Sequence, residues 1–487
     1  MLVVEVDLRP HITMFGSIQN YEDEDRMNIF SPNNIIGMDT AEIADLTDLV
    51  RLYDLHLSNN YTKEEYYEGK ISLSKVNLGI ALPDGLQKLE IGCAWGGKTV
   101  DVLAAKSMFD GYVGLNGEDV TELDQIVMDN NLVFEYGKAC RDELKFGCTF
   151  ATLSKGEDGK VKIRFHSPRT SAAKWDGIKN RIKCGFAIID TVPDEFDTSL
   201  WRPSLINYYT DDAIWVIELK NGSYYAIKHP HRMGRPLMEA LIWNATSNKP
   251  FGRSRIKEPV RRLIDGYVRT VANATIGLEF ATSPQKYLLG VSDEQFDAVV
   301  SDKFRQYVGS IITSTPNPET GESPSFGQLM QGSITPHVDM MRILSTQFSA
   351  ATGLTVSDTG VVNDANPTSS DAIIAQSKTL IEMAEELNKG NGYSLRTIAM
   401  MALAIYHNTT LDELSNAQKE VIAHFKNPAM PNIATTADAA LKIASGRPGF
   451  ANTDTFLEMI GFSQAEIRRI KAEEQKSRGL EVLTEIS

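Results

Sequence analysis

Two amphipathic helical segments on either side of a turn-rich insert constrain the fold of this chain more than any other feature. In residues 256–280 the apolar side chains recur with a period near 3.6 residues. The second segment starts at Pro336 and extends to about Ala351, again with one apolar face. The insert between them, residues 283–335, is rich in Pro, Gly and Ser. The pattern is that of two helices that bracket an insert, as two antiparallel helices would.

A polar loop and one very long helix follow these two segments. Residues 352–370 are small and polar and contain neither Lys nor Arg, so this loop has no cation to hold a phosphate. From about residue 371 to 408 the pattern predicts a helix of about 38 residues, which is long for a globular protein. Gly390-Asn391-Gly392 lies in its middle, where a kink or a break is expected.

The first half of the chain combines helices with antiparallel hairpins. Apolar residues at three-residue steps predict a helix from Thr40 to about Asn59, and Thr62 is expected to open a second, short one. Another helix is predicted from Val120 to Lys145. Strands are expected at 148–153, 161–165, 184–189, 213–219 and 224–227, with a turn at Asn221-Gly222. Hairpins in place of alternating strand–helix units indicate the α+β fold class. After residue 409 helices are predicted at 411–424, 436–443, 453–460 and 463–475.

Composition excludes several classes of protein. The chain has 487 residues, with 49 Lys and Arg against 64 Asp and Glu, for a net charge of −15. This balance does not favour a surface that grips nucleic acid by neutralising phosphates. Two acids inside the first apolar run argue against a secretory signal, and no apolar run is long enough to predict a transmembrane helix. None of the four cysteines forms a C-x-x-C pair, so we expect reduced, buried thiols.

One motif suggests an enzyme. Gly92–Thr99 fits the P-loop pattern G-x-x-x-x-G-K-[ST], in which Lys98 would contact the terminal phosphates of a nucleotide and Thr99 would hold Mg²⁺. The preceding residues 86–91 alternate in polarity, unlike the buried parallel strand that normally precedes a P-loop. A P-loop NTPase is therefore the alternative hypothesis, and an ordinary loop-to-helix turn is the simpler one.

Other candidate sites are weaker. His229 and His231 have no clustered acids or cysteines around them in the sequence, which argues against a metal site. Residues Glu90–Gly96 resemble an E-x-G-x-G-x-G methyltransferase loop, but Ala94 stands at the middle glycine and no parallel sheet is predicted around it. No catalytic residue set is apparent. The basic residues between 253 and 269 are equally consistent with phosphate contacts and with a solvated or subunit-pairing helix face.

The order of these elements resembles the portal proteins of tailed bacteriophages, in particular the family typical of siphophages of Gram-positive hosts. Each matching segment is short, and their common order from about Thr40 to Gln475 makes the resemblance specific. The segments are Trp95–Tyr112 with Val100-Asp101-Val102-Leu103, His231–Pro236, Phe251–Ile256, Leu263-Ile264-Asp265, Ala281–Gly290, Gly353-Leu354 and Asn366–Ile373.

The resemblance implies a portal fold with named parts. These are an N-terminal arm (1–40), an α+β wing (41–252), a stem helix (253–282), a small α/β clip (283–335), a second stem helix (336–352), a channel loop (353–370), a long kinked wing helix (371–408), and a helical crown with the C-terminal tail (409–487).

The resemblance also implies a function. Portal proteins form a ring, usually of about twelve copies, at a unique capsid vertex. Terminase packages double-stranded DNA through the ring, and the DNA later leaves by the same route. The expected partners are other copies of the chain, DNA, terminase, a head–tail adaptor, and capsid and scaffold proteins, with no membrane, cofactor, metal or enzymatic activity. The chain is expected in the host cytoplasm before assembly and in the virion afterwards.

Two groups of residues are expected to serve this role. Channel-loop residues expected to approach DNA are Val361, Val362, Asn363, Asp364 and Asn366. Basic residues expected on the stem are Arg253, Lys257, Arg261 and Arg262. An acidic conduit suits this function, because DNA that makes few phosphate contacts has few to break as it slides.

Overall fold

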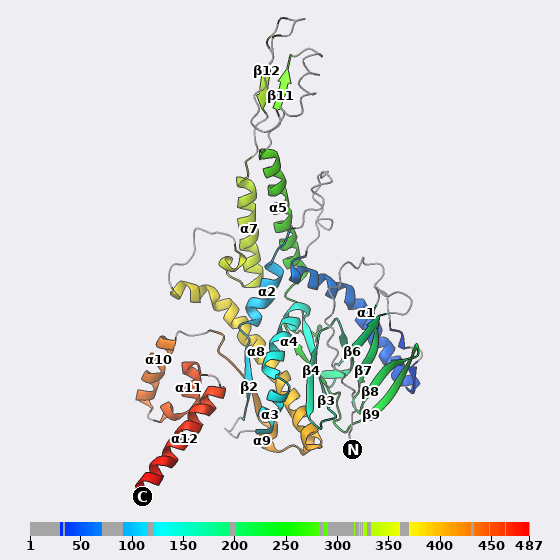
Figure 1. Cartoon of the computed structure of the whole chain (residues 1–487), viewed down its shortest axis with the longest axis vertical. Helices are drawn as coiled ribbons and strands as arrows, with labels where there is room; N and C mark the ends of the chain where they lie inside the picture. Colours follow the sequence, from blue (N-terminus) through cyan, green and yellow to red (C-terminus); the bar gives the residue numbers. More distant parts are fainter. Residues whose placement is uncertain are drawn as a thin grey trace.

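The computed structural model describes residues 30–32, 35–70, 91–114, 121–193, 201–282, 286–290, 316, 321, 323, 325–328, 333–360, 370–429, 433–447, 449–462 and 464–486. The molecule is elongated, with a broad body of strands and helices from which a pair of helices rises (Figure 1). The expected channel-loop residues Val361, Val362, Asn363, Asp364 and Asn366 lie outside the described residues, as do most of residues 1–40 and of the insert 283–335.

Two sheets form the framework of the body. A six-stranded sheet has the order β1-β9-β8-β7-β6-β5, and a three-stranded sheet has the order β10-β3-β4. Their strands are β1 (Ile35–Ile36), β3 (Cys148–Lys155), β4 (Val161–His166), β5 (Ser171–Asp176), β6 (Arg181–Pro193), β7 (Trp201–Tyr209), β8 (Ala213–Lys220), β9 (Ser223–Pro230) and β10 (Met238–Ile242). Only β1 and β9 pair in parallel in these two sheets. Asn221 and Gly222 both have positive φ, as the tight β8–β9 turn requires. The expected α+β class is confirmed.

Helix α1 (Thr40–Glu68) covers one face of the six-stranded sheet. Its buried Leu46, Leu49 and Val50 join the sheet residues Phe186 and Trp215 in one apolar cluster. The predicted break before Thr62 is wrong, because the Thr62 hydroxyl bonds to the Ser58 carbonyl one turn back within the same continuous helix.

The predicted helix from Val120 to Lys145 is two helices, α3 (Thr121–Asp129) and α4 (Leu132–Phe146). Asn131 has φ +48°, a left-handed conformation that interrupts a helix. The side chain of the preceding Asn130 donates to the carbonyl of Val161 and accepts from the amide of Ile163, so this turn is joined to β4. Helix α2 (Trp95–Ala104) and strand β2 (Phe109–Gly114) complete this part of the body.

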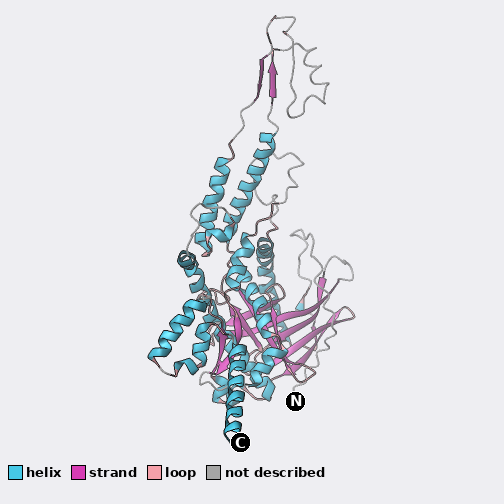
Figure 2. Ribbon diagram, turned by 60° about the vertical axis from the view of Figure 1, so that its left-hand side comes forward, coloured by secondary structure: helices cyan, strands magenta, loops and turns pink. Residues whose placement is uncertain are grey.

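Helices α5 (Glu258–Thr282) and α7 (Thr335–Thr352) form the rising pair, here called the α5–α7 pair. They pack through apolar side chains including Ile264 and Leu344, and a Cβ at Gly266 would lie 3.3 Å from the Leu344 side chain. Beyond the pair, β11 (Lys286–Leu289) and β12 (Ser325–Gln328) form an antiparallel ribbon (Figure 2). The predicted pairing of the two helices is confirmed.

Helix α8 (Ser370–His407) runs through the body for 38 residues. Its Leu395, Ile398 and Ala402 belong to the main buried cluster with β3, β10 and α4. Of the predicted kink or break at Gly390-Asn391-Gly392, the break is absent, since helix α8 continues through these residues, and the kink stays a prediction. Fully buried Asn391 bonds to side chains of α4, and these contacts fix this stretch of the helix in place.

The end of the chain is less helical than predicted. After η5 (Leu411–Glu413) and α9 (Asn416–Lys419), strand β13 (Val421–Phe425) pairs with β2. The predicted helix over 411–424 is therefore wrong: only the two short turns η5 and α9 are helical, and Val421 and Ala423 alternate inward as strand residues do. Helices α10 (Ile433–Gly446), α11 (Asp454–Ile460) and α12 (Gln464–Ile486), with η6 (Phe450–Asn452), form what is here called the C-terminal module.

Candidate functional site: the junction at the base of the helix pair

Segments far apart in the sequence meet where the α5–α7 pair joins the body (Figure 1). They are the start of α2, the residues just before α5, the end of α7, the short helix η4 (Val356–Thr359) and the first half of α8. This junction holds the described residues that lead to the undescribed segment 361–369. Its geometry therefore fixes the position of Gly360, the described residue before that segment.

Trp95 is the apolar centre of the junction. Its buried ring stacks on Tyr267 of α5 and Phe348 of α7, with ring centroids 4.2 and 4.7 Å away. Its indole Nε1 donates a 3.0 Å hydrogen bond to the carbonyl of Thr359. One side chain thus joins α2 to both helices of the pair and to η4. The sequence placed Trp95 in a family motif without indicating this role.

Arg255 is a buried cation at the same junction. Its Nε donates to the carbonyl of Thr99 and its Nη2 to the carbonyl of Thr352, both at 2.6 Å. Desolvation lowers the pKa of this guanidinium to about 10, so it stays charged at neutral pH. Thr352 is the last residue of α7, where the helix dipole is negative and favours a cation. Arg255 therefore holds the end of α7 against α2.

The residues after α7 are held by a dense set of local bonds. Thr355 caps η4, and its backbone N–H and side chain both donate to the carboxylate of Asp358. The hydroxyls of Thr359 and Ser345 lie 2.6 Å apart, which joins η4 to α7. Gly353 and Gly360 both have φ +74°, a conformation that glycine adopts at little cost. Residues 353–360 are thus a fixed bracket, and Gly360 is its last described residue.

The junction does not fit the P-loop hypothesis. Thr99 is buried and its hydroxyl bonds to the carbonyl of Trp95 at 2.9 Å, so it does not face a site that could hold Mg²⁺. A Cβ on Gly96 would lie 2.0 Å from the carbonyl oxygen of Tyr66, which shows that α1 packs directly on this turn. Lys98 is exposed on the outer side of α2. The motif is a helix start packed against α1, and no phosphate cradle is present at Gly92–Thr99.

The four basic residues expected on the stem occupy different positions. Arg253 precedes α5, and Lys257 is exposed immediately before its first turn. Arg261 is half-buried, with its guanidinium 5.9 Å from the ring centroid of Tyr66 on α1. Exposed Arg262 pairs with Glu258 on the same helix at 2.5 Å. They do not converge on one point, so no shared binding pocket follows from them.

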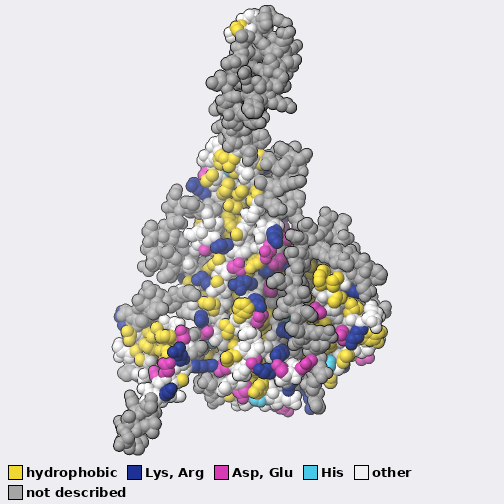
Figure 3. Space-filling view, in the orientation of Figure 1, with side chains coloured by type: hydrophobic (Ala, Val, Ile, Leu, Met, Phe, Trp, Pro, Cys, Tyr) yellow, Lys and Arg dark blue, Asp and Glu magenta, His cyan; other side chains and the backbone are white. Residues whose placement is uncertain are grey.

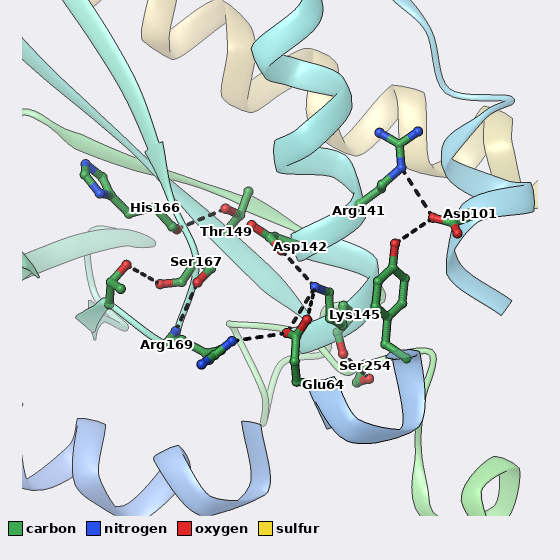
Figure 4. A network of polar contacts seen from close by, with 12 residues as sticks. Glu64, Asp101, Arg141, Asp142, Lys145, Thr149, His166, Ser167, Arg169 and Ser254 are labelled. Carbon is green, nitrogen blue, oxygen red and sulfur yellow. Dashed lines mark hydrogen bonds and ion pairs between the residues drawn. The ribbon is translucent and has the colours of Figure 1, made fainter. Parts of the chain in front are cut away.

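A network of ion pairs between α1, α2 and α4 lies next to the junction. Lys145 at the end of α4 lies 3.0 Å from Glu64 of α1 and 3.4 Å from Asp142, and Arg169 lies 3.8 Å from Glu64 (Figure 4). Ser254, directly before Arg255, donates to the Lys145 carbonyl. Arg141 pairs with Asp101 of α2 at 3.3 Å. These contacts fix α1, α2 and α4 around the residues that enter α5.

Two properties of the described residues bear on alternative functions. Among the described residues, no group of three or more His, Cys, Asp or Glu side chains could hold a metal ion. His229 and His231 do not form such a group. Within the same described part of the chain, no helix is long and apolar enough to cross a lipid bilayer.

Comparison with known proteins identifies the family. The model of the family described as "Phage portal protein, SPP1 Gp6-like" matches residues 95–479. The chain belongs to this family of phage portal proteins. The match covers the junction, the α5–α7 pair and α8 together, in agreement with the resemblance apparent in the sequence.

A sequence relative agrees with this assignment. The portal protein of Mycobacterium phage D29 is 23% identical over 453 residues, and the alignment covers 90% of each chain. Two solved structures are also similar. "Neck of native GTA particle computed with C12 symmetry" has a TM-score of 0.43, is 11% identical, and aligns with 80% of this chain and 93% of its own. "Neck of empty GTA particle computed with C6 symmetry" has a TM-score of 0.44, is 13% identical, and aligns with 78% and 90%.

The family settles the class of function. A phage portal protein is a structural channel component of the virion through which the genome is packaged and later released, and it is not an enzyme. The P-loop NTPase hypothesis is therefore excluded by the family as well as by the buried Thr99 hydroxyl.

Proposed function

We propose that about twelve copies of this portal protein close into a ring whose axial channel carries double-stranded DNA. The observation that carries the proposal is the set of large apolar side chains exposed along the α5–α7 pair, Leu278, Val338, Met340 and Ile343. Figure 3 shows hydrophobic side chains following the pair along its length. A narrow two-helix projection with such a surface is stable in water when neighbouring copies cover it.

Mass and a matched pair of variants test the ring. A closed ring of about twelve 53.9 kDa chains has a mass of about 650 kDa, measurable by light scattering or native mass spectrometry. Ile343→Glu, at a side chain 52% exposed, is expected to abolish the ring and leave a folded monomer. Leu55→Glu, at an α1 side chain 75% exposed, is the control that should still assemble. A wild-type chain that stays monomeric under every assembly condition would refute the proposal.

We further propose the division into arm, wing, stem, clip, channel loop, kinked helix and crown, with the boundaries given under Sequence analysis. The α5–α7 pair supports the stem, because it connects the body to the β11–β12 ribbon at the far end of the molecule. Arg253, Lys257, Arg261 and Arg262 would then lie at the start of the stem. Their exposed members are available to DNA or to a neighbouring copy.

Residues 353–370 are proposed as the channel loop, with Val361, Val362, Asn363, Asp364 and Asn366 facing DNA. The fixed bracket 353–360 supports this proposal, since it sets one end of the segment at the base of the stem. Asp364→Lys would add a cation that binds phosphate and is expected to slow or stop DNA packaging in a phage-infection assay. Asp358→Asn, in the bracket, controls for a local structural effect, and normal packaging by Asp364→Lys would contradict the assignment.

The remaining partners follow from the same proposal. Terminase and a head–tail adaptor would bind the clip end, capsid and scaffold proteins would surround the ring, and the chain would be made in the host cytoplasm before assembly. Co-purification of assembled rings with the terminase of the same phage, with and without residues 283–335, tests the clip assignment.

A further inference from the structure

A closed chain of buried polar groups joins α4 to the middle of α8. The amide nitrogen of Asn391 donates to Oε2 of Glu143 at 2.7 Å and to the hydroxyl of Tyr136 at 2.9 Å. The Tyr136 and Ser107 hydroxyls lie 2.7 Å apart, and Ser107 donates to Oδ1 of Asn388 at 2.6 Å. Because the Ser107 hydrogen goes to Asn388, the Tyr136 hydroxyl donates to Ser107. The chain thus starts and ends on α8.

Each polar hydrogen of the Asn391 amide group and of the Tyr136 and Ser107 hydroxyls has an acceptor, but two buried acceptors of this network have no hydrogen. Oε1 of Glu143 and Oδ1 of Asn391 are both buried without a partner. Both residues are fully buried, and an unmet buried acceptor is costly. The two atoms belong to the same two groups that already share the 2.7 Å bond. A single hydrogen on Oε1 would satisfy both, since a carboxylic acid and a carboxamide can bond mutually, O–H to C=O and N–H to O=C.

We propose that Glu143 is a protonated positioning residue, which binds Asn391 through both carboxyl oxygens and fixes α8 on α4 in a pH-dependent way. The location of Asn391 explains why a Gly-Asn-Gly sequence stays helical in the middle of α8. The segment proposed as the channel loop lies directly before α8 in the sequence, so a change at this joint acts on the helix that carries it.

The surroundings support a neutral carboxyl group. Burial raises the pKa of Glu143 to about 8, and the bond from Asn391 only partly offsets this. The titratable groups that face it are Tyr136 and Cys140 on α4 and Cys148 on β3. Burial raises the pKa of all three, so each stays neutral at physiological pH. No cation contributes to the pKa of Glu143 among the described residues. As pH rises, Glu143 is therefore the first of these four groups to lose its proton.

Glu143→Gln tests the proposal, because glutamine replaces the acid O–H by an amide N–H and has no charge. In the wild type the folded state keeps a proton that the unfolded state loses above its pKa of about 4.5, so stability falls as pH rises. The folding equilibrium constant is expected to drop about tenfold per pH unit between roughly pH 5 and 8 from this group. Glu143→Gln is expected to lack this component, and Glu386→Gln, an exposed change on α8, is expected to keep it. Identical pH profiles for the wild type and Glu143→Gln would overturn the proposal.

Two further measurements guard against a folding defect in that variant. The infrared spectrum of the wild-type chain at pH 7 is expected to contain the carbonyl band of a protonated carboxylic acid, and this band should disappear on titration above pH 8. Its absence at pH 7 would mean that Glu143 is ionised and would refute the proposal. Hydrogen exchange of the α8 amides around Asn391 should accelerate above pH 8 beyond the intrinsic increase in the wild type, and should not do so in Glu143→Gln.

Discussion

The body and the C-terminal module are held by different forces. Helix α8, α4, the three-stranded sheet and the α5–α7 pair share one continuous buried cluster that includes Trp95, Phe348 and Ile398. No described residue of the C-terminal module belongs to either buried cluster of the body. The polar contacts across this boundary include Arg468 with Asp124 of α3 and His424 of β13 with Glu458, 3.7 Å apart.

This difference predicts different sensitivities. Burial of apolar surface is insensitive to salt, whereas partly exposed ion pairs weaken as ionic strength rises. The body should therefore respond to changes in packing, and the attachment of the module to changes in charge.

Phe348→Ala should have the largest effect. Phe348 is fully buried between Trp95 and α5, and its truncation leaves a cavity in the main cluster. A loss of about 3–5 kcal/mol in the free energy of unfolding is expected, measured by urea denaturation. Met340→Ala, on the exposed side of the same helix, should cost far less. Equal losses for the two variants would mean that the helix pair does not contribute to the cluster as described.

Arg255→Met should have the next largest effect. The change keeps much of the side-chain volume but leaves the carbonyls of Thr99 and Thr352 without their donor, at a cost on the order of 2 kcal/mol. Hydrogen exchange is expected to increase in residues 353–360 before it increases elsewhere in the body. Arg262→Met, which removes an exposed arginine from the same region, should leave this pattern unchanged.

Acid should destabilise the body through His166. Burial lowers the pKa of His166 to about 4, and its Nε2 lies 3.0 Å from the Thr152 hydroxyl. The unfolded state then binds a proton that the folded state does not, so stability is lost as pH falls from about 6.5 to 4. His166→Gln should flatten this part of the stability profile measured by thermal unfolding. His337→Gln, on α7, is the matched control and should keep the stability profile of the wild type. A flattened profile in His337→Gln would mean that His166 is not the source of the acid sensitivity.

Changes in ionic strength should have the smallest effect, and they should weaken the attachment of the C-terminal module to the body. Asp124→Asn removes the partner of Arg468, a contact worth less than about 1 kcal/mol. Limited proteolysis between residues 426 and 433 is expected to accelerate in this variant and, in the wild type, as NaCl is raised. Asp454→Asn breaks the Lys471 pair inside the module and should leave cleavage at that boundary unchanged. Insensitivity of the wild type to salt would show that apolar contacts hold the module.

Local sequence signals predicted much of the fold, and they failed where a distant contact decided the outcome. The period near 3.6 in residues 256–280 and the turn at Asn221-Gly222 act within a few residues, and both predictions hold. Residues 411–424 fit a helical pattern, but β2 offers an open edge that pairs with β13. Asn130 looks like an ordinary helix residue until β4 supplies the backbone groups that its side chain binds.

The candidate site was less accessible to sequence analysis than the fold. The role of a buried tryptophan or arginine depends on the groups that it contacts. Trp95 bonds to Thr359 and Arg255 to Thr352, which lie far along the chain, so neither role could be inferred from the sequence. The P-loop pattern is likewise excluded by packing, since α1 lies directly on Gly96 and the Thr99 hydroxyl is bonded inside α2.

The sequence by itself determined the α+β class, the two amphipathic helices, the long helix and, through the order of short motifs, the portal family. Periodicity and turn chemistry depend on neighbours in the chain, so they can be inferred without coordinates. Only the tertiary structure decided that Trp95, Arg255 and Thr359 form a junction and that Glu143 meets Asn391. Desolvation and the matching of donors to acceptors depend on which distant groups exclude water together, and a linear pattern does not record this.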